Sequence, residues 1–238
     1  MLEAQIRIPT MKNILKGLEA IGEEVILNFN SKGLTATIVD SAVIKLFHMD
    51  VSSDAFEKYS CTGDVSYGVV IARMKDITKA LTAKDELKII GDADNLALLA
   101  NGIRRNIKLL NRALMSTPPS MPHFNYTYDA QIPALEARNF IKTLGDVLSF
   151  NITIDDAGKS MTWASESPEE AVEWIPTVSV LNTSQDSLTS YATEHIKLAI
   201  CATNRETMDI RSGDDLPIEF TWVPHEGVRL TSLVAART

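Results

Sequence analysis

The chain has 238 residues, 45% of them apolar and 23% charged, which is the composition of an ordinary globular protein and not of a disordered or fibrous one. This length accommodates one large domain or two of about 120 residues. Acidic residues outnumber Lys and Arg by 31 to 23, giving a net charge of −8, and this balance argues against a uniformly basic nucleic acid-binding domain. There is neither an apolar run of about 18 residues nor a signal-peptide pattern after Met1, so we expect an intracellular protein without a membrane partner.

The first half of the chain is predicted to alternate between helices and strands. A helix at residues 10–22, reading TMKNILKGLEAIG, precedes EVILNFNSKGLTATIVD at 24–40, where apolar and polar residues alternate as in paired strands. A second helix lies within YGVVIARMKDITKALTAKDELKI at 67–89, and NLALLANGIRRNIKLL at 95–110 predicts further strands.

The same order of elements returns in the second half. A helix at 133–145 (PALEARNFIKTLG) precedes the strands VLSFNITI at 147–154 and KSMTWASE at 159–166, and SYATEHIKLAICATNRETMDI at 190–210 corresponds to residues 67–89. Such an internal repeat predicts two similar domains. Between them, STPPSMPHFNYT at 116–127 contains three prolines, which are unsuited to the interior of helices or sheets.

We therefore predict a domain at 1–115, a connecting loop at 116–127 and a second domain at 128–238. Strands outnumber helices about four to one, which favours an α+β fold with antiparallel sheets and the helices on one face.

Three of the four predicted helices carry basic residues opposite their apolar stripe. In the helix at 10–22, a turn of about 100° per residue places Lys12 and Lys16 opposite the stripe that contains Met11. The basic residues placed in this way are Lys12, Lys16, Lys75, Lys79, Arg138 and Lys142, with Arg73 at the edge of its helix face and Asp76 among its neighbours. The fourth helix is less clear, since Lys197 is close to Glu194. Lysines on one solvated helix face usually serve solubility, but their repetition favours a concave positive surface that attracts a polyanion.

The sequence contains no catalytic or metal-binding constellation. Its four histidines are scattered, and it has no nucleophile elbow, P-loop or dinucleotide fingerprint. The stretch GDADN at 91–95 lacks the rest of a calcium loop and is interpreted as a turn between strands. Cys61 and Cys201 are far apart and predict reduced, buried thiols rather than a disulfide. We therefore expect no enzymatic activity and no cofactor.

Five stretches together carry a resemblance to a known family: MLEAQIRI at the start, SKGLTATIVDSAVIKLFHMDV at 31–51, FEKYSC at 56–61, MPHFNYT at 121–127 and GDDLPIEF at 213–220. Over essentially its whole length the chain resembles the DNA sliding clamps of the proliferating cell nuclear antigen type, especially the archaeal ones. No single motif is diagnostic, but the order and spacing of the five make the resemblance specific.

The resemblance implies two similar domains per subunit and three subunits joined head to tail in a ring whose twelve helices surround duplex DNA. Twelve helices at about 10 Å spacing need a circle roughly 38 Å across, which leaves about 28 Å clear. Such a ring holds DNA by topology and needs only a weak, sequence-independent attraction to phosphates. Glu19 and Asp76 stand where a family member can carry Lys, so we expect a sparser positive lining than usual. The residues expected to face DNA are Lys12, Lys16, Arg73, Lys75, Lys79, Arg138, Lys142 and Lys197.

The resemblance also implies an outer pocket for a short partner peptide, bound with micromolar affinity. DNA polymerase, a clamp loader, a flap nuclease and a ligase are the expected partners. An exposed apolar connector is consistent with such a docking surface. The residues that match this pocket are Val39, Ile44, Leu46, Met121, Pro122, Tyr126, Leu216, Pro217 and Ala235.

Subunits of the family meet where an edge strand of one domain pairs with an edge strand of the next subunit, which removes two exposed edges. By position these strands are GIRRNIKLL at 102–110 and WIPTVSVL at 174–181. The residues expected at this subunit interface are Ile103, Arg105, Ile107, Leu109, Val178 and Val180.

Two departures from the family pattern flank the expected pocket. The chain ends in Ala235-Ala236-Arg237-Thr238 where the family closes with Ala-Pro-Arg/Lys-Ile, and Val43 stands where a His is often found. The alternative interpretations are a subunit of a heterotrimeric or specialised repair clamp and, less favoured, a small-molecule-binding α+β protein. The latter requires a concave pocket with convergent polar groups, which no residue set suggests.

Overall fold

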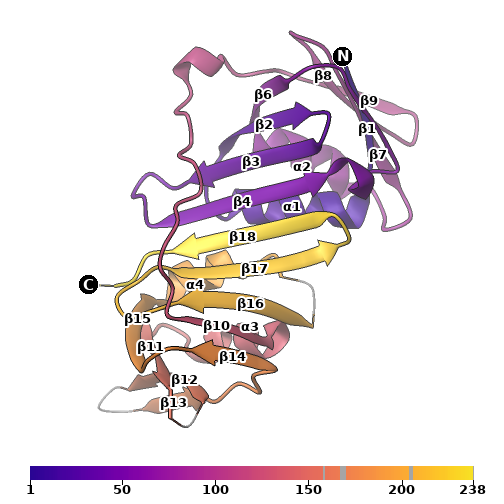
Figure 1. Cartoon of the computed structure of the whole chain (residues 1–238). Helices are drawn as coiled ribbons and strands as arrows, with labels where there is room; N and C mark the ends of the chain where they lie inside the picture. The colour runs from indigo at the N-terminus through magenta and orange to yellow at the C-terminus, as the bar shows by residue number, and fades with distance from the viewer. Residues whose placement is uncertain (158, 167–169, 204–205, 238) are drawn as a thin grey trace. The chain divides into compact units, whose positions relative to one another are not determined.

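The computed structural model describes residues 1–157, 159–166, 170–203 and 206–237, and for Val180 it describes the backbone (Figure 1). The expectations for the side chain of Val180 and for Thr238 therefore lie outside the described residues. Two short 3-10 turns, Ser53–Ala55 and Arg112–Leu114, accompany the helices and strands.

The first half of the chain forms nine strands and two helices within the described ranges, in the order β1 (Leu2–Arg7), α1 (Ile8–Glu19), β2 (Glu24–Asn30), β3 (Gly33–Val39), β4 (Lys45–Ser52), β5 (Lys58–Cys61), β6 (Val65–Val70), α2 (Ile71–Lys79), β7 (Glu86–Gly91), β8 (Leu96–Ala100) and β9 (Ile103–Ile107). Helix α1 begins earlier than the predicted residue 10, with Pro9 in its first turn, where a missing N–H costs nothing.

The second half repeats this order in its described residues: β10 (Tyr128–Pro133), α3 (Ala134–Thr143), β11 (Ser149–Asp155), β12 (Ser160–Glu166), β13 (Ala171–Trp174), β14 (Val180–Thr183), β15 (Ser187–Ala192), α4 (Thr193–Ala199), β16 (Thr207–Ser212), β17 (Ile218–His225) and β18 (Val228–Val234). The predicted internal repeat and the α+β class are confirmed.

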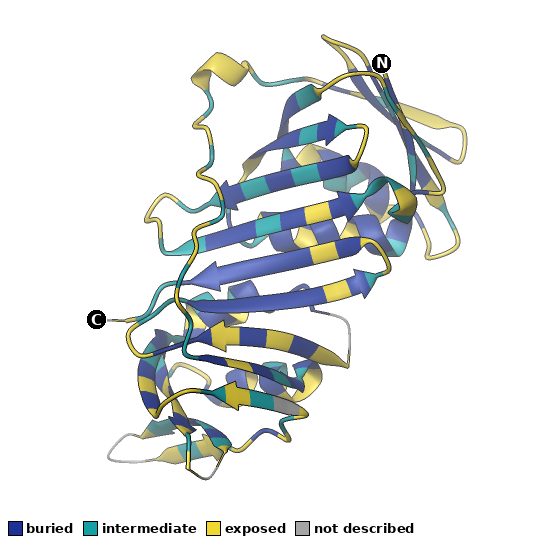
Figure 2. Cartoon of the chain, viewed as in Figure 1, coloured by how far each residue is buried: buried dark blue, intermediate teal, exposed yellow. Residues whose placement is uncertain are grey.

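Strand pairing repeats as well. Strand β1 pairs antiparallel with β5 and β7, and its counterpart β10 pairs with β14 and β16. Strand β2 pairs with β3 and β6, and β11 pairs with β12 and β15. One sheet therefore has the order β5-β1-β7-β8-β9 and another the order β13-β12-β11-β15. Buried and exposed residues alternate along strands such as β16, visible as bands in Figure 2.

In the part of the chain that the structure describes, α1, α2, α3 and α4 each begin directly where a strand ends and have no side-chain N-cap. A backbone carbonyl accepts the first helical N–H instead, and it comes from the residue just before a strand at equivalent places in the two halves. These bonds run from Ile8 to Asp85 (3.2 Å), from Ala134 to Glu206 (2.9 Å), from Ile71 to Glu23 (2.9 Å) and from Thr193 to Leu148 (3.0 Å). Donors that side-chain caps usually satisfy are thus satisfied by tertiary structure.

The chain divides into two compact units. The first unit contains residues 1–40, 47–121 and 223–230, and the second contains residues 41–46, 122–222 and 231–238. Within the first unit, α1 and α2 pack against each other, and within the second α3 and α4 do so. The domain boundaries at 115 and 128 stay a prediction.

The apolar stripes of the helices form much of each unit's core. In α1, Met11, Leu15 and Leu18 are at most 2% exposed, as the periodicity predicts. In the second unit, Phe140 of α3 joins an aromatic cluster with Phe150, Trp163 and Trp174, whose ring centroids lie 5.2–6.0 Å apart. Burying these rings leaves the opposite helix faces to solvent.

Two predictions from the sequence are corrected. Residues 174–181 are not one strand, because β13 ends at Trp174 and β14 begins at Val180; Pro176 between them lacks the N–H that a ladder requires. Within the described residues, neither Cys61 nor Cys201 takes part in a disulfide, and both are partly exposed rather than buried as predicted. Cys61 lies in β5, an edge strand, where its thiol donates to the carbonyl of Gly63 (3.2 Å).

Candidate functional site

The solvent-exposed face of α1 and α2 in the first unit is basic. Lys12 and Lys16 on α1, and Arg73 and Lys79 on α2, are exposed, while Lys75 is partly exposed. The Lys12 ammonium donates to the carbonyl of Leu81 (2.8 Å) just beyond the end of α2, so it also satisfies a carbonyl near a helix C-terminus, where a cation is favoured. The predicted basic face therefore exists on these two neighbouring helices.

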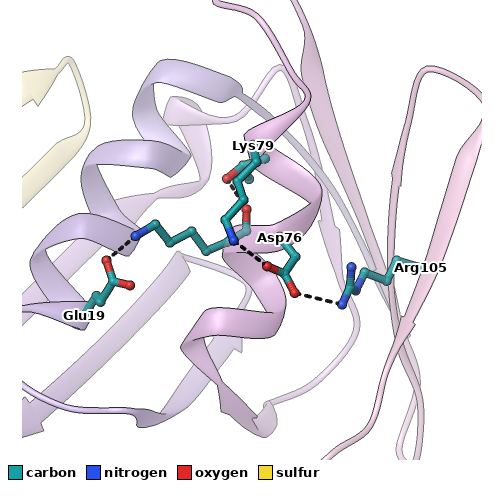
Figure 3. A network of polar contacts seen from close by, with 6 residues as sticks. Glu19, Asp76, Lys79 and Arg105 are labelled. Carbon is teal, nitrogen blue, oxygen red and sulfur yellow. Dashed lines mark hydrogen bonds and ion pairs between the residues drawn. The ribbon is translucent and has the colours of Figure 1, made fainter.

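Two carboxylates lie within this basic face and pair with it (Figure 3). Glu19 of α1 accepts from the Lys75 ammonium of α2 at 2.5 Å, which joins the two helices. Asp76 accepts from Lys79 through Oδ1 (2.8 Å) and from the Arg105 guanidinium through Oδ2 (3.1 Å). The hydrogen bond from Lys79 and the positive charges nearby lower the pKa of Asp76 below its ordinary value. The expectation that Glu19 and Asp76 weaken the positive lining is consistent with these pairs.

The helices of the second unit carry fewer basic residues on their exposed faces. Lys142 of α3 is exposed, whereas Arg138 is partly buried, and its Nε has no hydrogen-bond partner in the described part of the chain. On α4, Lys197 pairs with Glu194 at 3.2 Å, one turn earlier on the same helix.

The residues matched to a peptide pocket divide between the units. Val39 and Met121 lie in the first unit, and the other seven lie in the second. In the second unit, the N–H of Ala235 donates to the carbonyl of Ile44 (2.9 Å), which brings two of the expected pocket residues together. Ile44 follows Val43, which is 75% exposed and has φ of 56°, a conformation that strains a β-branched residue.

Tyr126 of the connector lies over a charged pair on the second unit's sheet. Arg211 of β16 and Glu219 of β17 are opposite each other in the ladder, and the guanidinium donates to Glu219 Oε1 through Nη2 and through Nε (3.1 Å). The Arg211 guanidinium carbon lies 5.4 Å from the centre of the Tyr126 ring, a cation–π distance. The Tyr126 hydroxyl reaches Glu219 Oε2 at 3.4 Å.

Glu219 is the buried member of this group. Its side chain is 7% exposed against 51% for Arg211, and the bond to Glu219 raises the pKa of Arg211. Burial, together with the charge of Glu219, raises the pKa of the Tyr126 hydroxyl. Tyr126 is therefore neutral and held against a preorganised ion pair.

Leu216 and Pro217 occupy the turn between β16 and β17. Both carbonyl oxygens lie 3.1 Å from the hydroxyl oxygen of Ser212, which shares its single proton between them, and the carbonyl of Leu216 also accepts from the Tyr191 hydroxyl (2.9 Å). These bonds to buried hydroxyls position the turn next to the strands that carry Arg211 and Glu219.

The residues expected at a subunit interface lie partly on unpaired strand edges. Strand β9 pairs on one side with β8 and is the last strand of its sheet, and Ile103 on it is 54% exposed. Ile107 is buried, Leu109 follows the end of the strand, and Arg105 pairs with Asp76 of its own chain. In the second unit β14 pairs with β10 on one side, and Val178 precedes β14 in a segment without strand structure.

Sequence reasoning missed the Arg211–Glu219 pair. A signal was present, since Glu219 stands between Ile218 and Phe220 in an apolar strand, and a carboxylate there needs a partner. Identifying the partner required the register of the β16–β17 hairpin.

The described residues offer no competing metal site or membrane segment. Within them, no group of three or more His, Cys, Asp or Glu residues is arranged to hold a metal ion. No helix in the same ranges is long and apolar enough to cross a membrane. The stretch at 91–95 is a turn between β7 and β8, in which Asp92 accepts from the N–H groups of Asp94 and Asn95, both at 2.9 Å. The interpretation of this stretch as a turn between strands is confirmed.

Comparison with known proteins agrees with this architecture. Residues 1–115 match the family described as proliferating cell nuclear antigen, N-terminal domain. The chain is 25% identical over 221 residues, 88% of each chain, to the DNA polymerase sliding clamp of Nitrosopumilus maritimus. It is 23% identical over 239 residues, 98% of this chain and 96% of the relative, to the DNA polymerase sliding clamp of Thermoplasma acidophilum. The solved structure of the C-terminal region of FEN-1 bound to A. fulgidus PCNA matches with a TM-score of 0.93 at 17% identity, over 100% of this chain and 99% of the other.

Proposed function

We propose that this chain, whose residues 1–115 match the N-terminal domain of proliferating cell nuclear antigen and whose whole length has the fold of that antigen, is a DNA sliding clamp. It encircles duplex DNA as a ring and tethers polymerase and other replication and repair proteins to it. The observation that supports this function best is the pair of neighbouring helices in each unit with basic residues on the exposed face. Such faces attract phosphates without reading bases.

The ring is proposed to be a homotrimer of two-domain subunits. Edge strands β9 and β14 are the surfaces proposed to meet between subunits, because each pairs on one side within its own chain. A heterotrimer with related subunits is the alternative.

Partner proteins are proposed to dock through short peptides on the connector at 116–127 and on the other residues matched to the outer pocket. The relative whose solved structure matches binds a C-terminal region of FEN-1, which supports a flap nuclease as one partner of this chain. Polymerase, ligase and a clamp loader are proposed from the family alone. The clamp itself is proposed to catalyse no reaction and to need no cofactor, and to work in the cytoplasm on the nucleoid in an archaeal host, or in the nucleus in a eukaryotic one.

A threading experiment tests the function. The protein is incubated with a linear duplex immobilised at one end, the free end is blocked with a bulky protein, and the beads are washed at high salt. A ring around the DNA survives the wash because salt weakens phosphate contacts but not topology, and cutting the duplex releases it. Protein lost in the wash as readily from blocked as from open DNA would contradict encirclement.

The basic helix faces are tested separately. Replacing Lys12, Lys79 and Lys142 by Ala removes three positive charges per subunit from helices, so stimulation of a polymerase should fall and its salt dependence should flatten. Unchanged stimulation at low salt would contradict the assignment of these faces to DNA.

A further inference from the structure

The basic face of α1 and α2 contains carboxylates that form ion pairs with the residues proposed to attract DNA. Glu19 pairs with Lys75 at 2.5 Å across the two helices, and Asp76 pairs with Lys79 at 2.8 Å along α2. Figure 3 shows the carboxylates of Glu19 and Asp76 joined by dashed lines to the side-chain nitrogens that they contact. Lys75 and Lys79 are thus each paired with a carboxylate of their own chain.

Asp76 is held in place by the protein and not by Lys79 alone. Its second oxygen accepts from Arg105 at 3.1 Å, and Arg105 belongs to strand β9. The side chain of Lys79 is 66% exposed and that of Asp76 is 39% exposed. A Lys79 ammonium that turned toward a phosphate would leave this carboxylate on the face, still paired with Arg105.

We propose that Glu19 and Asp76 limit the attraction of the helix face for DNA, so that Lys75 and Lys79 must each leave an internal carboxylate to contact a phosphate. This inference rests on the proposed clamp function and adds a determinant of how firmly the ring holds the duplex. A lysine with its own carboxylate partner carries little net charge, so it releases few counterions when DNA binds. Weak attraction suits a ring that is retained by topology, since strong phosphate contacts would oppose sliding.

The test compares variants in which a carboxylate is replaced by a neutral amide with a matched control variant. Glu19→Gln and Asp76→Asn keep side-chain size and remove one negative charge each. Glu3→Gln is the control, because Glu3 pairs with Lys88 at 2.7 Å but both residues lie on strands β1 and β7, away from the helix face. Affinity for a short duplex is measured by fluorescence anisotropy at several salt concentrations, and the mass of each variant is checked by light scattering.

Each lysine that gains a phosphate contact should steepen the slope of log affinity against log salt by about 0.9. The ratio of affinities between about 50 and 200 mM salt should therefore rise about 3.5-fold for each variant at the helix face. Glu3→Gln, with the same change in net charge, should leave this ratio nearly unchanged.

An unchanged slope in Glu19→Gln, or an equal steepening in Glu3→Gln, would overturn the proposal. Glu19→Gln decides the matter if Asp76→Asn disturbs folding or assembly, since Glu19 and Lys75 are both about two-fifths exposed. Failure of the wild-type protein in the threading experiment would instead contradict the clamp function itself, so the two failures are distinguishable.

Discussion

Tyr126 shows how a single connector residue depends on charges brought together by folding. The buried carboxylate of Glu219 holds the Arg211 guanidinium beneath the Tyr126 ring. Glu219→Gln should weaken the hydrogen bonding that holds Arg211 in place by about 1.5 kcal/mol. This value is at the low end for a charged hydrogen bond, because water reaches the half-exposed Arg211. If Tyr126 belongs to the peptide pocket, a partner-motif peptide should then bind about tenfold more weakly by calorimetry.

The matched control at the residue scale is Tyr126→Phe. The 3.4 Å contact of the Tyr126 hydroxyl with Glu219 is long, so losing it should change peptide affinity by less than about threefold. Tyr126→Ala combined with Ile44→Ala should abolish binding. If Glu219→Gln and Tyr126→Phe reduced the affinity for the peptide equally, the Tyr126 hydroxyl, and not the position of its ring over Arg211, would determine that affinity.

At the scale of elements, helix α1 packs closely on strand β4 at Gly17. A Cβ on Gly17 would lie 2.3 Å from the Phe47 ring, and Phe47 is 1% exposed, so the ring has little room to move. Gly17→Ala gains about 1 kcal/mol of helix propensity but overpacks the core at a cost of about 1–3 kcal/mol. We expect net destabilisation of about 1 kcal/mol in urea-induced unfolding.

A double-mutant cycle that combines Gly17→Ala with Phe47→Leu isolates the contact between Gly17 and Phe47. Because the smaller side chain frees space beside α1, Gly17→Ala should cost less in the Phe47→Leu background than in the wild type. Additive effects of the two substitutions would show that the Gly17–Phe47 contact does not set the helix-to-strand distance.

At the scale of the whole molecule, assembly decides whether this chain alone makes a ring. Light scattering across a dilution series should find roughly 79 kDa, three times the 26.2 kDa chain. Ile103→Asp places a charge on the exposed edge strand β9 and should reduce the mass toward that of the single chain, since charges on an edge oppose strand pairing.

Leu114→Asp is the control for assembly, because Leu114 is 84% exposed but lies in the 3-10 turn after β9. It should leave the trimer intact. A wild-type chain that is monomeric or dimeric would favour a heteromeric clamp that needs related subunits, or a protein that is no clamp.

The sequence by itself determined the features that depend on neighbours along the chain. Met11 and Leu18 repeat with the period of a helix, so their burial and the exposure of Lys12 follow from local geometry. The repeated order of elements, the proline-rich connector and the turn at 91–95 likewise need no knowledge of distant residues. The family resemblance, which is also carried by the sequence alone, indicates the function.

Only the tertiary structure decided which distant side chains meet. Glu19 and Lys75, and Arg211 and Glu219, become partners because two helices pack side by side and one hairpin takes a particular register. The first N–H of α1 likewise finds its acceptor in Asp85, and the break before β14 separates residues that alternate like a strand. A periodic pattern specifies which face of an element is buried, but the partners of a polar group depend on how elements pack, and packing is a property of the whole fold.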